Sequence, residues 1–74
     1  MNLTTAKSQV LQELRLSRGW TLRKVSSKGL IALGYLSEIE RGKKQPSDEV
    51  LAELLRTFEV SQADFLRKVA DLVE

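Results

Sequence analysis

Basic side chains, the groups that bind phosphate, are concentrated in the first part of this 74-residue chain. Residues 1–44 contain nine lysines and arginines against three acidic residues, a net charge of +6. Residues 45–74 contain three basic and seven acidic residues, a net charge of −4. A basic surface facing a polyanion, with an acidic surface turned away, is the electrostatic pattern of nucleic-acid binding. The alternative from charge alone is a chance asymmetry between solvated faces.

The sequence lacks the residues that catalysis, metal binding and disulfide formation usually need. The sequence contains no cysteine and no histidine, which excludes disulfides, thiolate or imidazole metal sites, and cysteine or histidine nucleophiles. Its acidic residues are scattered, without a glycine-rich phosphate loop or a nucleophile–base pair. We therefore expect no enzyme activity, metal, cofactor or small-molecule ligand. No apolar run approaches the roughly 18–20 residues of a membrane span, and the first residues lack a signal-peptide core. We expect a soluble intracellular protein without a membrane partner.

Apolar residues recur at helical spacing along a chain long enough for one domain, residues 1–74. The pattern predicts an all-α fold of five helices without a sheet. In chain order, the predicted helices are about Thr5–Ser17, Leu22–Lys28, Leu33–Glu40, a helix capped by Ser47, and residues 61–73. Thr21 and Ser61 are good N-caps for the second and fifth helices, whereas Ala32 before the third is a poor one.

The second and third predicted helices, joined by a three-residue turn, form a helix-turn-helix candidate over about residues 21–41. In that geometry the first helix lies across the phosphate backbone. The second helix enters the major groove, whose width admits one α-helix. Spacing alone is weak evidence, because short helix pairs also occur in ordinary bundles.

Two motifs strengthen this interpretation. They are Leu14-Arg15-Leu16-Ser17-Arg18-Gly19-Trp20-Thr21 and Tyr35-Leu36-Ser37-Glu38-Ile39-Glu40-Arg41-Gly42-Lys43-Lys44-Gln45-Pro46-Ser47. In order and separation they resemble the Cro/CI (XRE) family of bacterial and phage repressors, over about residues 8–66. The resemblance implies a lambda-repressor-like DNA-binding domain, a partner in double-stranded DNA, and a cytoplasmic, nucleoid-associated regulator of transcription.

The sequence departs from the family pattern at two positions. Leu22 stands where the family usually has a glutamine that touches a phosphate, and a leucine side chain cannot donate a hydrogen bond. Leu30 falls at the usual turn glycine, while Gly29 comes one residue earlier. Either the turn is shifted by one residue or a non-glycine residue has a positive φ, and both would tilt the third helix slightly.

The third helix, about residues 33–40, is expected to contact bases through the face opposite Leu36 and Ile39. That face carries Leu33, Gly34, Ser37 and Glu38. In the resembling repressors, the positions matching Leu33, Gly34 and Glu38 reach base edges. Here Leu33 would contact a thymine methyl, Gly34 would let the helix backbone approach the bases closely, and Glu38 would accept a hydrogen bond from a cytosine amino group. Alternatively, Leu33 is a core or dimer contact, and Glu38 is solvated or pairs with a nearby arginine. Because the face lacks arginine, glutamine and asparagine, we expect modest direct readout and a larger share from DNA shape.

Phosphate contacts are expected around the second helix and after the third. The predicted phosphate-binding residues are Thr21, Arg23, Lys28, Tyr35, Arg41, Lys43 and Lys44. The resemblance also implies a structural ion pair between Arg15 and Glu40, which would tie the first helix to the end of the third. The alternative is two independent surface charges.

The C-terminal segment has more apolar surface than one small core needs. Leu66, Val69 and Val73 recur at i, i+3, i+7, so we interpret them as a homodimer face that places two recognition helices on a palindromic site. The alternative is that they simply cap the core. The aromatic residues Trp20, Phe58 and Phe65 are expected in the core, not as base-stacking groups.

The sequence therefore predicts a sequence-specific, double-stranded DNA-binding transcriptional regulator. The rival interpretation is a protein-interaction module that uses the same fold to bind an unrelated protein, such as a toxin or a second regulator. Salt dependence separates the two, because only the DNA binder releases counterions from a duplex.

Overall fold

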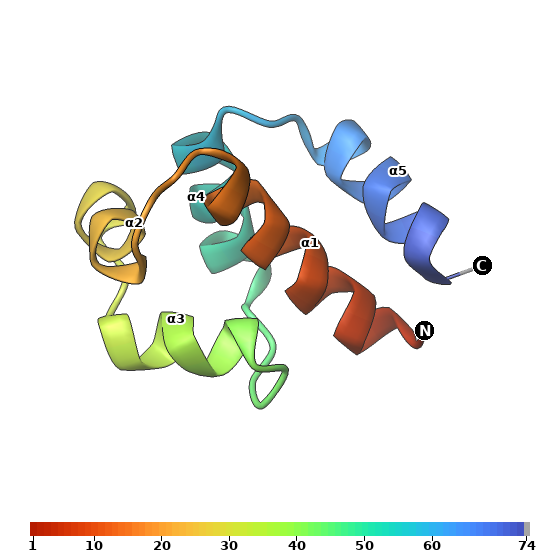
Figure 1. Cartoon of the computed structure of the whole chain (residues 1–74), viewed down its shortest axis with the longest axis horizontal. Helices are drawn as coiled ribbons and strands as arrows, with labels where there is room; N and C mark the ends of the chain where they lie inside the picture. The colour runs from red at the N-terminus through yellow and green to blue at the C-terminus, as the bar shows by residue number, and fades with distance from the viewer. Residues whose placement is uncertain (74) are drawn as a thin grey trace.

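The computed structural model describes residues 1–73 and contains five helices and no strand over that range (Figure 1). The helices are α1 (Leu3–Ser17), α2 (Leu22–Gly29), α3 (Leu33–Glu40), α4 (Asp48–Phe58) and α5 (Gln62–Val73). The predicted all-α fold is confirmed. The α1 helix begins two residues earlier than predicted because Asn2 is an N-cap, whose side-chain oxygen accepts a hydrogen bond from the Thr5 amide at 2.8 Å.

Three of the helices begin at the hydroxyl caps that the sequence predicts. The hydroxyls of Thr21, Ser47 and Ser61 accept hydrogen bonds from amides three residues later, at 3.1, 3.2 and 3.0 Å. Ala32 provides no side-chain cap for α3. The start of α3 therefore depends on the turn before it and on tertiary contacts.

The core is a single apolar cluster to which every helix contributes. In Figure 1, α1 lies between α3 on one side and α5 on the other, while α2 packs against α3 and α4. The α5 helix packs on α1 through Phe65 and Val69, and Val69 is only 3% exposed. This placement corrects the predicted dimer stripe: Val69 belongs to the core and cannot contact a second copy, whereas Leu66 and Val73 are exposed.

Phe58 and Phe65 are fully buried, as expected of core aromatic residues. Trp20 is half-buried and stacks on Phe58, with ring centroids 6.1 Å apart. The aromatic pair joins the segment after α1 to the end of α4.

The turn between α2 and α3 contains a leucine in the left-handed region. Leu30 has φ +55° and ψ +44°, and its side chain is 92% exposed. Of the two alternatives that the sequence leaves open, the turn therefore uses a non-glycine residue at positive φ. Gly29 has a different role, because a Cβ there would lie 3.0 Å from the Thr57 hydroxyl oxygen. Its missing side chain lets α2 lie close against α4.

Replacing Leu30 by glycine should stabilise the protein by about 0.5–1 kcal/mol, because glycine adopts the left-handed conformation without the steric cost that leucine has there. The exposed leucine side chain contributes almost no burial. Thermal unfolding should show a Tm a few degrees higher. Leu30→Ala is the control, since it removes the side chain but keeps the strained backbone, and its Tm should stay near that of the wild type. Equal gains in both variants would show that backbone strain is not the cause.

Candidate nucleic-acid interface

The predicted ion pair between Arg15 and Glu40 is present and positions α3. The Arg15 Nε donates to Glu40 Oε2 at 2.7 Å, and Nη2 donates to Oε1 at 2.9 Å. The two side chains are only 12% and 5% exposed. The hydrogen bonds that Arg15 donates to Glu40, together with the negative charge of this carboxylate, raise the pKa of Arg15 against the opposing effect of burial. This fork-shaped contact fixes the C-terminal end of α3 against α1.

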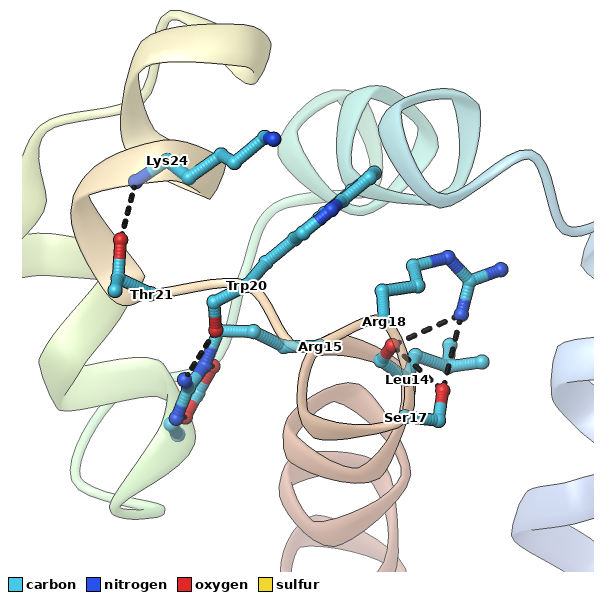
Figure 2. A network of polar contacts seen from close by, with 8 residues as sticks. Leu14, Arg15, Ser17, Arg18, Trp20, Thr21 and Lys24 are labelled. Atoms are coloured by element: carbon cyan, nitrogen blue, oxygen red, sulfur yellow. Dashed lines mark hydrogen bonds and ion pairs between the residues drawn. The ribbon is translucent and has the colours of Figure 1, made fainter.

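The same guanidinium also holds the start of α2. Its Nη1 donates to the Trp20 carbonyl oxygen at 2.9 Å, one residue before the Thr21 cap (Figure 2). Arg15 therefore reaches the entry to α2 and the end of α3 at once. This one side chain thus links both helices of the helix-turn-helix unit to α1.

Arg18 is a second structural arginine, whose role the sequence did not reveal beyond its place in the motif. Figure 2 shows it at the end of α1, where Nη1 donates to the Leu14 carbonyl at 2.8 Å. Its Nη2 donates to the Phe58 carbonyl at 2.5 Å, and the guanidinium lies 5.4 Å from the Phe58 ring centroid. Arg18 closes the C-terminal end of α4 and is not part of the predicted interface.

The exposed face of α3 is short and carries few large or charged side chains. Gly34 is exposed, and no atom of the described residues outside its local backbone lies within 4 Å of a Cβ added there. Leu33, Ser37 and Glu38 are half-exposed around it, opposite the buried Leu36 and Ile39. The predicted base-contacting residues thus share one accessible face, with the glycine at its centre.

The basic loop after α3 folds back on the helix. The backbone amides of Lys43 and Lys44 both donate to the Glu38 carbonyl, at 2.9 and 3.3 Å. The Lys44 ammonium lies 3.3 Å from the Glu38 carboxylate, so Glu38 has a basic partner, which is a lysine and not the arginine that the alternative named. The Tyr35 hydroxyl donates to the Gln45 carbonyl at 3.2 Å. These contacts hold Arg41, Lys43 and Lys44 beside the exposed face of α3.

The N-terminal end of α2 is the other flank of the site. Thr21 accepts from the Lys24 amide, and Arg23 is exposed beside it. The first amides of a helix have no partner within the helix and attract anions. Lys28 lies at the far end of α2, with its ammonium 5.2 Å from the Trp20 ring centroid. Lys24 lies 5.4 Å from the same ring. Lys24 and Lys28 thus both lie beside Trp20, the residue that precedes Thr21.

Within residues 1–73, no helix is long and apolar enough to cross a membrane. Over the same residues, no three acidic side chains gather closely enough to hold a metal ion.

A family model described as helix-turn-helix matches residues 11–65. The chain belongs to the helix-turn-helix regulators of the XRE family, as its motifs indicated.

Two regulators of known name are similar to it. The transcriptional regulator ClgR of Mycobacterium tuberculosis is 49% identical over 51 residues, which are 69% of this chain and 46% of ClgR. The chain thus spans about half the length of this curated relative. The crystal structure of the clp gene regulator ClgR from Corynebacterium glutamicum has a TM-score of 0.90 at 35% identity, covering 100% of this chain and 96% of that one.

The restriction-modification controller protein C.Esp1396I also has this fold. Its tetramer in complex with its natural 35 base-pair operator matches with a TM-score of 0.90 and 25% identity. The match covers 99% of this chain and 96% of that one.

Replacing Arg15 by methionine should lower the free energy of unfolding by about 3 kcal/mol, because it leaves the buried Glu40 carboxylate without its partner. In a domain of this size the Tm should fall by more than about 10 °C. Arg56→Met is the matched control, because Arg56 pairs with Glu53 at the same 2.7 Å but lies on the surface of α4. Its Tm should stay unchanged. A similarly small effect of Arg15→Met would contradict the structural role of the ion pair.

Proposed function

We propose that this chain is a sequence-specific DNA-binding domain of a transcriptional regulator, with α3 in the major groove. The observation that carries the proposal is the exposed face of α3 around Gly34, flanked by a basic loop held against the same helix. A bare helix face between phosphate-binding groups is the arrangement with which helix-turn-helix proteins dock on a duplex.

The charge distribution supports the same orientation. The basic residues 1–44 include α1, α2, α3 and the start of the loop, and the acidic residues 45–74 include α4 and α5. With α3 against the duplex, the excess negative charge would lie on the side away from the phosphates. The operator complex of C.Esp1396I supports DNA binding by this fold. Binding to chromosomal DNA would place the protein in the cytoplasm, at the nucleoid.

The proposed phosphate contacts fall into two groups. Thr21 and Arg23 offer one group through the amino end of α2, and Arg41, Lys43 and Lys44 offer the other beyond α3. Tyr35 contributes by fixing the loop through Gln45, and its hydroxyl can contact a phosphate only by giving up that hydrogen bond. Lys28 is exposed beside Trp20, and its ammonium has donors free for a phosphate.

Base contacts are proposed for Leu33, Gly34, Ser37 and Glu38. Gly34 would let the helix backbone approach the groove floor, and Leu33 would contact a thymine methyl. Glu38 already has Lys44 as a partner, so an amino group of cytosine would have to compete with it. The small number of hydrogen-bonding side chains favours a large contribution from DNA shape.

We further propose a homodimer on a palindromic operator, with α5 in the subunit interface. Leu66 is 57% exposed beside a groove of about 310 Å³ between α4 and α5, lined by the apolar residues Leu51, Leu55 and Phe65. Val73 is exposed at the end of the same helix. Two-fold pairing through this face would set two α3 helices about one DNA turn apart.

Binding to random duplex DNA should weaken steeply with salt, because each phosphate contact releases condensed counterions. With four contacts, the affinity should fall about 100-fold between 50 and 200 mM salt. A gel-shift or fluorescence-anisotropy titration at several salt concentrations measures the slope. No binding even at the lowest salt would reject the DNA-binding proposal and favour the protein-interaction alternative.

Replacing Gly34 by leucine should separate stability from DNA binding. The free protein has room for the side chain, and removing a helical glycine should stabilise it by about 0.5–1 kcal/mol. The leucine would nevertheless stand between α3 and the floor of the groove and weaken duplex binding at least about tenfold. Ala63→Leu adds comparable bulk to the exposed first turn of α5 and should leave binding unchanged. If Gly34→Leu binds DNA as the wild type does, α3 does not approach the groove through this face.

A further inference from the structure

The one acidic side chain on the exposed face of α3, Glu38, is joined to the following loop at two points. Its backbone carbonyl oxygen accepts a hydrogen bond from the Lys44 amide at 3.3 Å. The Lys44 ammonium also lies 3.3 Å from Oε1 of the Glu38 carboxylate. The backbone and the side chain of Lys44 thus both contact the same glutamate, so the fold of the loop places the ammonium beside the carboxylate.

This ion pair lies on the side of α3 that is proposed to enter the major groove. Glu38 follows Gly34 by four residues, so the two residues share one face of the helix. The side chains of Glu38 and Lys44 are 36% and 57% exposed. A duplex that approaches Gly34 would therefore also meet the carboxylate and the ammonium.

The charges of the pair cancel, which removes a cost of placing an acidic residue in the groove. A carboxylate by itself would be repelled there by the phosphates of both strands. Beside the Lys44 ammonium, Glu38 is part of a neutral unit with hydrogen-bond acceptors at one end and donors at the other. The ion pair leaves both ends able to bind, because a carboxylate has a second oxygen and an ammonium has further N–H donors. An amino group of cytosine competes with Lys44 only for the oxygen that the ammonium faces.

A G·C base pair has the complementary pattern on its major-groove edge. The cytosine amino group is a donor, and the guanine beside it offers two acceptors, O6 and N7. Glutamate is suited to the cytosine amino group, and lysine is suited to the guanine acceptors. In an A·T pair the adenine amino group lies between N7 and the thymine O4, so an ammonium next to the carboxylate meets a single acceptor. The ion pair therefore matches G·C better than A·T.

We infer that Glu38 and Lys44 together recognise one G·C base pair, with the carboxylate on the cytosine amino group and the ammonium on the guanine acceptors. Lys44 is then a specificity-determining residue that lies outside the recognition helix, in addition to any contact that it makes with a phosphate. This inference rests on the proposed function. It adds one feature of the operator, a G·C pair beside the carboxyl end of α3.

Selection of bound sequences from a randomised duplex library tests the inference, because it measures base preference separately from affinity. The wild type should select a G·C pair at one position of its site. Lys44→Ala should reduce the preference for G·C over A·T at this position at least about fivefold, the lower limit for a good base contact. The backbone amide that holds the loop remains in this variant. Its Tm should change by no more than a few degrees, because exposed ion pairs contribute little stability.

Lys43→Ala is the matched control. Lys43 is exposed, has the same charge and also donates its amide to the Glu38 carbonyl, whereas the Glu38 carboxylate pairs with Lys44. This variant should lower the affinity for all duplexes alike and keep the preference for G·C. Glu38→Ala should lose the same preference as Lys44→Ala. In the Glu38→Ala background, Lys44→Ala should remove no further base preference, because the two side chains act as a unit.

The outcomes separate this inference from the function on which it rests. Lys44→Ala could select the same sequences as the wild type, or lose affinity for all sequences alike as Lys43→Ala does. Either result would overturn recognition of a base pair by the ion pair and leave the proposed function intact. Loss of a preference for A·T in Lys44→Ala would overturn the assignment to G·C. If the unmodified chain selects no sequence, both the inference and sequence-specific binding are overturned.

Discussion

The ion pair between Arg15 and Glu40 is the contact on which the arrangement of the helix-turn-helix unit depends. The α3 helix has eight residues and no side-chain cap at its start, and a helix that short is not stable by itself in water. Its position must come from tertiary contacts, and the bidentate contact to Glu40 supplies one at its last residue. The third donor of the same guanidinium holds the Trp20 carbonyl before α2. One buried arginine thus links three helices that also share the apolar core.

The remaining contacts leave the outer face of α3 free. The turn before it is closed by Leu30 in the left-handed region and by the Ser26 hydroxyl, which donates to the Ile31 carbonyl. The loop after it is held by two backbone hydrogen bonds to Glu38. Because the backbone of α3 itself anchors this basic loop, the flanking charges keep a fixed position relative to the exposed face. The basic residues that would supply affinity for DNA and the α3 face that would supply selectivity would then belong to one rigid unit.

Local rules were enough to predict most of the fold, because hydroxyl caps and apolar spacing act over a few residues. Asn2 was missed as a cap because the regular apolar pattern of α1 begins only at Val10, eight residues later. Val69 was wrongly assigned to the dimer face because it belongs to two apolar stripes of α5. It shares the i, i+3, i+7 spacing with Leu66 and Val73, but together with Phe65 it forms the side that packs on α1. The choice between them depends on the orientation of α5, which sequence spacing does not define. The contacts of Arg18 with Phe58 join distant segments and have no local signal in the sequence.

The central claim is that α3 and the elements that flank it, and not α4 or α5, face the DNA. Amide chemical-shift changes in the ¹⁵N-labelled protein during titration with a short duplex test it most directly, because they report the contacted surface residue by residue. The account predicts the largest changes at residues 33–44 and 21–23. Changes confined to residues 48–73, with α3 unaffected, would contradict it.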